Sequence, residues 1–174
     1  MILKGEKVVL RPLEVEDART IVPLINDAEL RQYLLQVFPI NKFMEENWIK
    51  NHSSSSNEVN LAITTDDELI GVTGYMNIDW VNRCAEFGIG IFNKKYWGKG
   101  YGTETTKLML EYAFRKLNLN RVYLRVFDYN ERAIRAYEKC GFVLEGRQRQ
   151  AVFSNGRYHD VLMMSILAEE YFKP

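Results

Sequence analysis

Three strand-like runs of β-branched and apolar residues follow one another in the middle of the chain, and they restrict the fold more than any other feature. The runs cover residues 59–65, 68–78 and 84–92. Asp66-Asp67 separates the first two and suits a tight hairpin turn. We therefore expect a three-stranded meander at the centre of the fold.

Apolar residues recur at helical spacing before this meander and again after it. Pro23 should kink or shorten the first helix, while Asn130 and Gly141 suit the start and end of the last one. The turn at Asn155-Gly156 predicts a closing hairpin. We expect further strands at 7–13, 121–127, 142–153 and 157–167, and helices at 14–27, 30–51 (in two pieces), 103–118 and 131–140. This order predicts a mixed α+β or α/β sheet of about six or seven strands and about four helices, in one domain over residues 1–174.

The composition argues against several classes of partner. Lysine plus arginine equals aspartate plus glutamate at 23 each, so no net field attracts nucleic acid or an anionic membrane. Cys84 and Cys140 lack metal-ligand spacing, and we expect reduced thiols and no metal site. The charged N-terminus does not resemble a signal peptide, and no apolar stretch approaches the roughly 20 residues of a membrane span. We expect a cytoplasmic protein.

A glycine-rich stretch, YWGKGYGTE at residues 96–104, immediately precedes a predicted helix. Its G-x-G-x-G spacing fits neither the dinucleotide-binding fingerprint nor the P-loop, which ends in Gly-Lys-Ser/Thr. One remaining interpretation is a tight turn that binds nothing. The other is an anion site, because glycines expose main-chain N–H groups and the first helical turn has unpaired ones. Lys94, Lys95 and Lys99 add positive charge and favour a polyphosphate ligand.

Two other local patterns have open interpretations. Gly88 and Gly90 lie inside a predicted strand, where glycine marks a bulge or the close approach of another group. Tyr137 shares a helical face with Asn130. A phenol of pKa near 10 could protonate a thiolate whose thiol has a pKa near 8.5. Spacing alone favours a partly buried aromatic side chain for Tyr137.

Taken together, the motifs resemble those of the GNAT superfamily of acetyl-CoA-dependent N-acetyltransferases. The resemblance is strongest to the branch containing ribosomal-protein N-terminal acetyltransferases and spermidine acetyltransferases. It extends over nearly the whole chain, through LRPLEVEDA (10–18), AEFGIGI (85–91), YWGKGYGTE (96–104), NERAIRAYEKCGF (130–142) and FSNGRYHDVLMMSI (153–166).

The resemblance implies a mostly antiparallel sheet with one splayed strand pair, acetyl-CoA as co-substrate, and direct attack of an amine on the thioester. It makes Tyr137 the candidate general acid. At the first position of the glycine loop the family usually has Gln or Arg, whereas this chain has Trp97, so a contact from that side chain is in doubt. The implied cofactor-binding residues are Ile89, Gly90 and Ile91 on the pantetheine arm, Trp97, Gly98, Lys99, Gly100, Tyr101, Gly102 and Thr103 around the diphosphate, and Asn130, Ala133 and Tyr137 on the following helix.

The catalytic base is open at this stage. Glu86 begins the glycine-bearing strand and could draw a proton from the amine through a water. It could equally be a structural acceptor. His52 and His159 are weaker candidates, and some family members work without a dedicated base.

The acceptor amine is also open. An apolar rim, with Tyr33 and Phe38 as candidate substrate contacts, favours a protein N-terminus or a small primary amine. A polyamine remains the alternative, with Glu29, Glu45 and Glu46 as possible acidic contacts. From another class, a non-catalytic acyl-CoA-binding regulatory module would retain the glycine loop without needing Tyr137. A homodimer is expected by analogy only.

Overall fold

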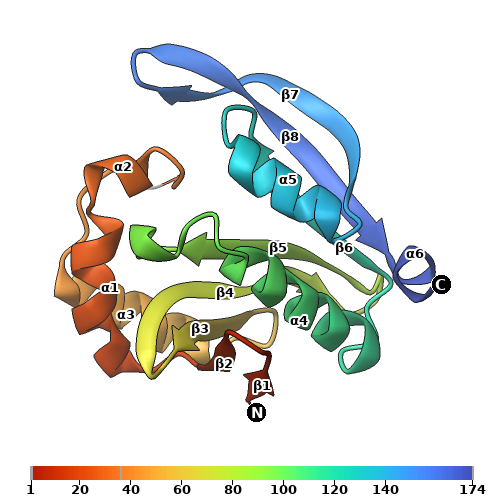
Figure 1. Cartoon of the computed structure of the whole chain (residues 1–174), viewed down its shortest axis with the longest axis horizontal. Coiled ribbons are helices and arrows are strands. Elements are labelled where there is room, and N and C mark those ends of the chain that lie inside the picture. Colours follow the sequence, from red (N-terminus) through yellow and green to blue (C-terminus); the bar gives the residue numbers. More distant parts are fainter. Residues whose placement is uncertain (1, 36, 174) are drawn as a thin grey trace.

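The computed structural model describes residues 2–35 and 37–173 and contains one central eight-stranded sheet (Figure 1). The strand order is β1-β2-β3-β4-β5-β6-β8-β7, and every neighbouring pair is antiparallel except β5 and β6. The strands are β1 (Leu3–Lys4), β2 (Val9–Pro12), β3 (Val59–Thr65), β4 (Glu68–Asp79), β5 (Cys84–Ile91), β6 (Arg121–Phe127), β7 (Val143–Ser154) and β8 (Arg157–Leu167).

Six α-helices and two 3₁₀ helices accompany the sheet within the described residues. The predicted mixed α/β class is confirmed, and the extra elements are short ones that leave no periodic pattern. They include the two-residue strand β1 and the brief helix α6. The two helical pieces expected within 30–51 are α2, which begins at Ala28, and α3, which ends at Ser53. The helices are η1 (Val15–Asp17), α1 (Ala18–Ile25), α2 (Ala28–Arg31), α3 (Lys42–Ser53), η2 (Lys94–Tyr96), α4 (Tyr101–Arg115), α5 (Glu131–Lys139) and α6 (Ala168–Phe172).

Side-chain caps explain where the helices α2 and α3 begin. Asp27 accepts hydrogen bonds from the main-chain N–H groups of Glu29 and Leu30 at the start of α2, and Asn41 accepts one from Met44 at the start of α3. Such caps satisfy donors that have no partner inside the helix. Pro23 lies inside α1, and the helix ends two residues later.

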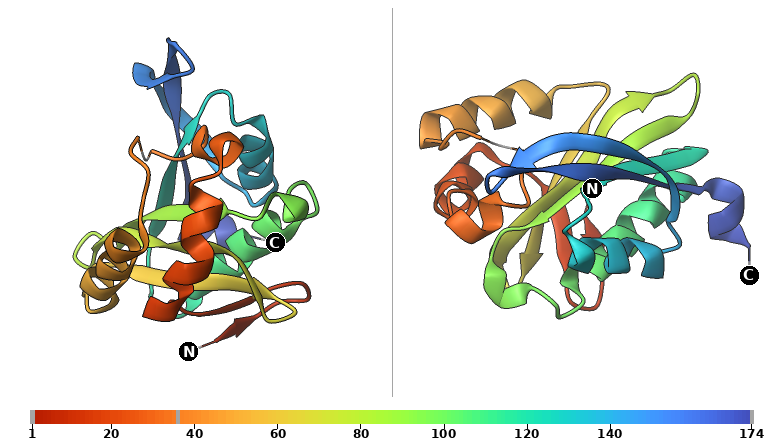
Figure 2. Two further views of the ribbon diagram at one scale, coloured as in Figure 1. Left: turned by 90° about the vertical axis from the view of Figure 1, so that its left-hand side faces the viewer. Right: turned by 90° about the horizontal axis from the view of Figure 1, so that it is seen from above.

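Helices cover both faces of the sheet (Figures 1 and 2). On one face, Leu110 of α4 and Tyr137 of α5 belong to a buried cluster that includes Ile63 of β3. On the other, Ile21 of α1 packs in a second cluster with Ala62. Neighbouring residues of a strand point to opposite faces, so Ala62 faces one core and Ile63 faces the other.

The single parallel pair in the sheet is splayed, as the family resemblance implies. Only residues 84–86 of β5 pair with β6, where they lie opposite residues 121–123. Beyond Glu86, β5 remains paired with β4, while β6 diverges and remains paired with β8. The main-chain groups of residues 87–91 that point toward β6 therefore have no ladder partner in that strand.

Candidate active site

A cavity of about 360 Å³ lies beside this fork. The glycine loop, the end of β5, helix α5 and the α2 segment all contribute to its wall. Three of its side chains are cationic and none is acidic, which suits a ligand rich in phosphate. The lining residues are Leu30, Tyr33, Leu34, Ile89, Gly90, Ile91, Tyr96, Trp97, Gly98, Gly100, Gly102, Thr103, Thr106, Asn130, Arg132, Ala133, Arg135, Ala136, Tyr137 and Lys139.

The glycine loop adopts a conformation that requires glycine at two positions. Gly98 and Gly100 have φ angles of +69° and +89°, in the left-handed region that other residues rarely enter. Gly100 is the N-cap of α4, so the helix begins at Tyr101, two residues earlier than the sequence predicts. Gly102 consequently lies in the first helical turn, facing the cavity, where main-chain N–H groups are unpaired within the helix.

Two of the expected loop contacts, Lys99 and Tyr101, do not line the cavity. Tyr101 packs edge-on against Tyr96, with ring centroids 5.0 Å apart. The carbonyl of Lys99 accepts a hydrogen bond from Lys7 Nζ at 3.0 Å. Neither side chain belongs to the cavity wall. For these two residues, cofactor binding remains a prediction about the main chain.

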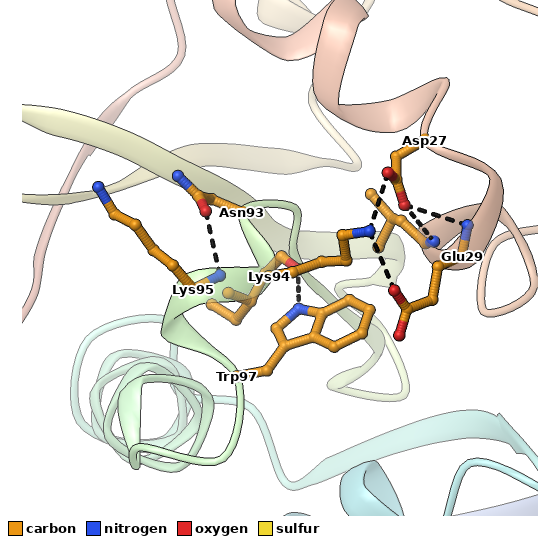
Figure 3. A network of polar contacts seen from close by, with 8 residues as sticks. Asp27, Glu29, Asn93, Lys94, Lys95 and Trp97 are labelled. Atoms are coloured by element: carbon orange, nitrogen blue, oxygen red, sulfur yellow. Dashed lines mark hydrogen bonds and ion pairs between the residues drawn. The ribbon is translucent and has the colours of Figure 1, made fainter.

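The positive charge expected from Lys94 and Lys95 is neutralised by carboxylates. Lys94 Nζ lies 2.9 Å from both Asp27 Oδ2 and Glu29 Oε2 (Figure 3). Lys95 Nζ lies 2.7 Å from Glu68 Oε2. These pairs bind the loop to α2 and to β4, so the two lysines position the site and do not supply free cations to it.

The strand glycines make room for side chains on the far face of the sheet. A Cβ on Gly90 would lie 2.4 Å from the ring of Phe92, and one on Gly88 would lie 3.2 Å from Met76. The irregularity in the β4–β5 register lies instead between Met76 and Asp79. Of the two interpretations of these glycines, the structure supports close approach.

Trp97 and Arg132 form a stack at one wall of the cavity. Trp97 Nε1 donates a hydrogen bond to the carbonyl of Ile91 at 2.7 Å. The Arg132 guanidinium lies 3.8 Å from the centroid of the Trp97 ring and 5.4 Å from that of Tyr33. Sequence analysis did not single out Arg132, although it lies two residues after Asn130 inside the motif that carried the family resemblance.

Tyr137 is buried at the cavity wall. Its ring packs against Phe87 and Phe142, with centroids 6.3 Å and 5.7 Å away. Burial, and to a lesser degree the neighbouring Cys140, holds the pKa of Tyr137 well above its usual range. The phenol therefore stays protonated at neutral pH, as a proton donor must. Asn130 caps α5 by accepting a hydrogen bond from the Ala133 N–H at 3.3 Å.

Glu86 lies at the fork but outside the cavity wall. It is 6% exposed, and its carboxylate accepts hydrogen bonds from Arg125 Nε at 2.7 Å and Asn77 Nδ2 at 3.2 Å. Because Phe87 packs on the Tyr137 side, the preceding Glu86 side chain points to the other face of the sheet. The candidate base and the candidate acid thus lie on opposite faces.

Of the expected apolar rim, the structure brings Tyr33 to the cavity and leaves Phe38 outside it. Phe38 is 75% exposed and does not line the cavity. Leu30, inside the short helix α2, and Leu34, three residues after that helix ends, complete the wall near Tyr33. Tyr129 joins this edge, because its hydroxyl donates a hydrogen bond to the carbonyl of Gln32 at 2.6 Å.

The carboxylates considered as acceptor contacts have different environments. Glu29 is paired with Lys94, and Glu46 lies 3.3 Å from Lys42 Nζ. Glu45 is buried in α3, and this burial raises the pKa of its carboxyl. Among residues 2–35 and 37–173, no group of three or more His, Cys, Asp or Glu side chains is arranged to hold a metal ion. No helix in the same ranges is long and apolar enough to cross a membrane.

Comparison with known proteins gives three consistent findings. Residues 7–143 match the family model described as an acetyltransferase (GNAT) domain. The chain is 37% identical, over 168 residues, to spermidine N(1)-acetyltransferase of Escherichia coli (strain K12), covering 96% of this chain and 89% of that protein. It is also 30% identical to a ribosomal N-acetyltransferase-like protein of Bacillus subtilis (strain 168), covering 96% and 94% of the two chains.

Among solved structures, the chain resembles spermidine N-acetyltransferase from Vibrio cholerae in complex with CoA and spermine. The TM-score is 0.89 at 33% sequence identity, over 97% of this chain and 100% of that one. The likeness therefore extends over nearly the full length of both chains.

Proposed function

The chain belongs to the GNAT family and is an acetyl-CoA:amine N-acetyltransferase, and from this premise we propose that its acceptor is a polyamine of the spermidine class. The observation that supports this acceptor is the full-length likeness to a protein solved with CoA and spermine. Family membership favours the enzyme over the acyl-CoA-binding regulatory module. A homodimer stays a prediction.

In the mechanism we propose, the cavity residues hold acetyl-CoA and two side chains handle protons. The main-chain N–H groups of residues 98–103 and the cationic side chains of the cavity wall suit the diphosphate. The main-chain groups of β5 that have no ladder partner in β6 suit the pantetheine arm. Acetyl-CoA supplies an activated acetyl group as a thioester. Attack by a neutral amine forms the amide bond and breaks the carbon–sulfur bond. Tyr137 then gives its proton to the departing sulfur, and Glu86 takes the proton of the amine through water.

The role of Glu86 as the catalytic base can be tested by comparing variants of Glu86 and of its ion-pair partner Arg125. We expect Glu86→Gln to lower kcat at least tenfold, since a positioned base contributes about 100-fold or more, while the melting temperature changes little. Arg125→Ala also breaks the Glu86–Arg125 contact but leaves the carboxylate in place, so it should retain most of the activity. The measurements are steady-state kinetics and thermal unfolding of both variants. Equal losses of stability and activity in the two would assign Glu86 a structural role only.

A second acceptor class is favoured by the wall chemistry. Tyr33, Leu30 and Leu34 give the acceptor side of the cavity an apolar and aromatic lining. Apolar contacts suit a small hydrophobic amine or a peptide N-terminus better than a chain of ammonium groups.

An acceptor panel separates these possibilities. Thiol release from acetyl-CoA would be measured with spermidine, a monoamine such as phenethylamine, and a peptide with a free N-terminus, and each product would be identified by mass spectrometry. We expect kcat/KM for spermidine to exceed the other two at least tenfold, which corresponds to about 1.4 kcal/mol of transition-state discrimination. The reverse ranking would replace the polyamine with the second class and leave the acetyltransferase activity unaffected.

A further inference from the structure

Beyond the main-chain amides of the loop, we propose that Arg132 is a phosphate-binding side chain of the coenzyme A site, held in position by Trp97 and Tyr33. The inference depends on the family's use of acetyl-CoA and is independent of which amine accepts the acetyl group. It adds a side-chain contact, from α5, to a site otherwise built from loop backbone.

The first support is geometric. Arg132 is the second residue of α5 and lines the same cavity as the loop glycines. Its guanidinium stacks on Trp97 at 3.8 Å, and Tyr33 approaches it at 5.4 Å. A planar guanidinium stacked on an aromatic ring loses little freedom on binding an anion, and its fork of donors matches two oxygens of one phosphate.

The second support is electrostatic. Five other arginines of the described chain form ion pairs with carboxylates, whereas no carboxylate of a described residue lies within ion-pair distance of Arg132. Its side chain is half-buried, and this burial lowers its pKa. The Glu29 carboxylate acts on Arg132 through space and partly offsets this lowering of the pKa, but Lys94 already binds that carboxylate. The paired arginines are Arg11, Arg121, Arg125, Arg135 and Arg147.

An unpaired cation that is partly removed from water is costly unless a ligand supplies the opposite charge. The cavity wall offers no carboxylate for this purpose. Phosphate is the group of coenzyme A that carries the required charge.

The third support comes from Trp97 itself. The indole N–H of Trp97 donates to the Ile91 carbonyl, so this side chain has no donor left for a phosphate. The loop therefore begins with a residue that presents a flat ring, and the ring orients a cation from a different helix. Because Tyr33 contacts the same guanidinium, the phosphate contact also connects the cofactor to the acceptor-side segment.

The test compares three ligands that differ in their phosphates: coenzyme A, dephospho-CoA and pantetheine. Binding to wild type and to Arg132→Ala would be measured by calorimetry, and by NMR titration for the weak ligand pantetheine. We expect Arg132→Ala to weaken coenzyme A binding 10- to 100-fold and to leave pantetheine binding unchanged. Arg132→Lys retains the charge without the planar stack, and we expect an intermediate loss.

The ligand series also identifies the phosphate. An equal loss for coenzyme A and dephospho-CoA assigns Arg132 to the diphosphate, and a loss confined to coenzyme A assigns it to the 3′-phosphate. Lys116→Ala, at the exposed far end of α4, is the control for removing one positive charge. Unchanged coenzyme A affinity in Arg132→Ala would overturn the proposal, as would an equal loss for pantetheine, which would mean that Arg132 only supports the fold. Failure of spermidine as acceptor would leave this binding result unaffected.

Discussion

Replacing Tyr137 by phenylalanine is expected to lower kcat about 100-fold, the contribution typical of a positioned general acid. The substitution removes only the hydroxyl, so the ring contacts with Phe87 and Phe142 remain. Acetyl-CoA affinity should therefore change much less than turnover. The measurement is steady-state thiol release together with calorimetric titration of acetyl-CoA.

The pH dependence of this variant tests the same assignment. Burial raises the pKa of Tyr137 far above its ordinary value, so the phenol keeps its proton throughout pH 6 to 9. The ratio of wild-type to Tyr137→Phe turnover should therefore be constant over that range. The neutral phenol favours the folded state most below the ordinary tyrosine pKa, about 10, and this contribution decreases as pH rises above it. Equal turnover of the two proteins at every pH would remove Tyr137 from the mechanism.

Replacing Gly102 by leucine is expected to weaken acetyl-CoA binding about 100-fold while leaving the protein folded. A Cβ at this position would contact only Ile91 Cγ1, at 3.9 Å, and Gly102 lines the cavity. The folded protein therefore has room for a larger side chain here. Leucine is also favoured over glycine inside a helix by about 1 kcal/mol. The new side chain would occupy space that we assign to the diphosphate, and losing one or two charged hydrogen bonds costs about 3 kcal/mol.

Calorimetric titration of acetyl-CoA and thermal unfolding measure the two halves of this prediction. Gly146→Leu is the matched control, because a Cβ on Gly146 in β7 also meets open space but lies outside the cavity wall. If Gly102→Leu bound acetyl-CoA as tightly as wild type, the loop would be an ordinary turn and the diphosphate would lie elsewhere.

Local chemistry made several features predictable from the sequence. Glycine at positions 98 and 100 predicted a loop with exposed main-chain N–H groups. Both residues take left-handed conformations that other residues rarely adopt. Asn130 predicted a helix start and caps α5. The turns at 66–67 and 155–156 predicted hairpins that β3–β4 and β7–β8 form. Each of these depends on a few neighbouring residues whose backbone preferences are strong.

Other features depended on contacts between distant parts of the chain. The strand β1 has two residues and exists because it pairs with β2. Lys94 and Lys95 were expected to serve a phosphate, but residues 27 to 67 positions earlier in the chain provide the carboxylates that bind them. Phe38 follows apolar neighbours in sequence yet lies outside the cavity, whereas Tyr33 reaches it.

The sequence by itself thus determined the order of strands and helices, the glycine loop and the family, because each is written in short patterns or in a motif series that spans the chain. Only the tertiary structure decided which charges are free. It paired Glu86 with Arg125 across the fork and left Arg132 stacked on Trp97, with no carboxylate partner among residues 2–35 and 37–173. Ion pairing and desolvation depend on distances in space, and residue spacing along a chain does not specify those distances.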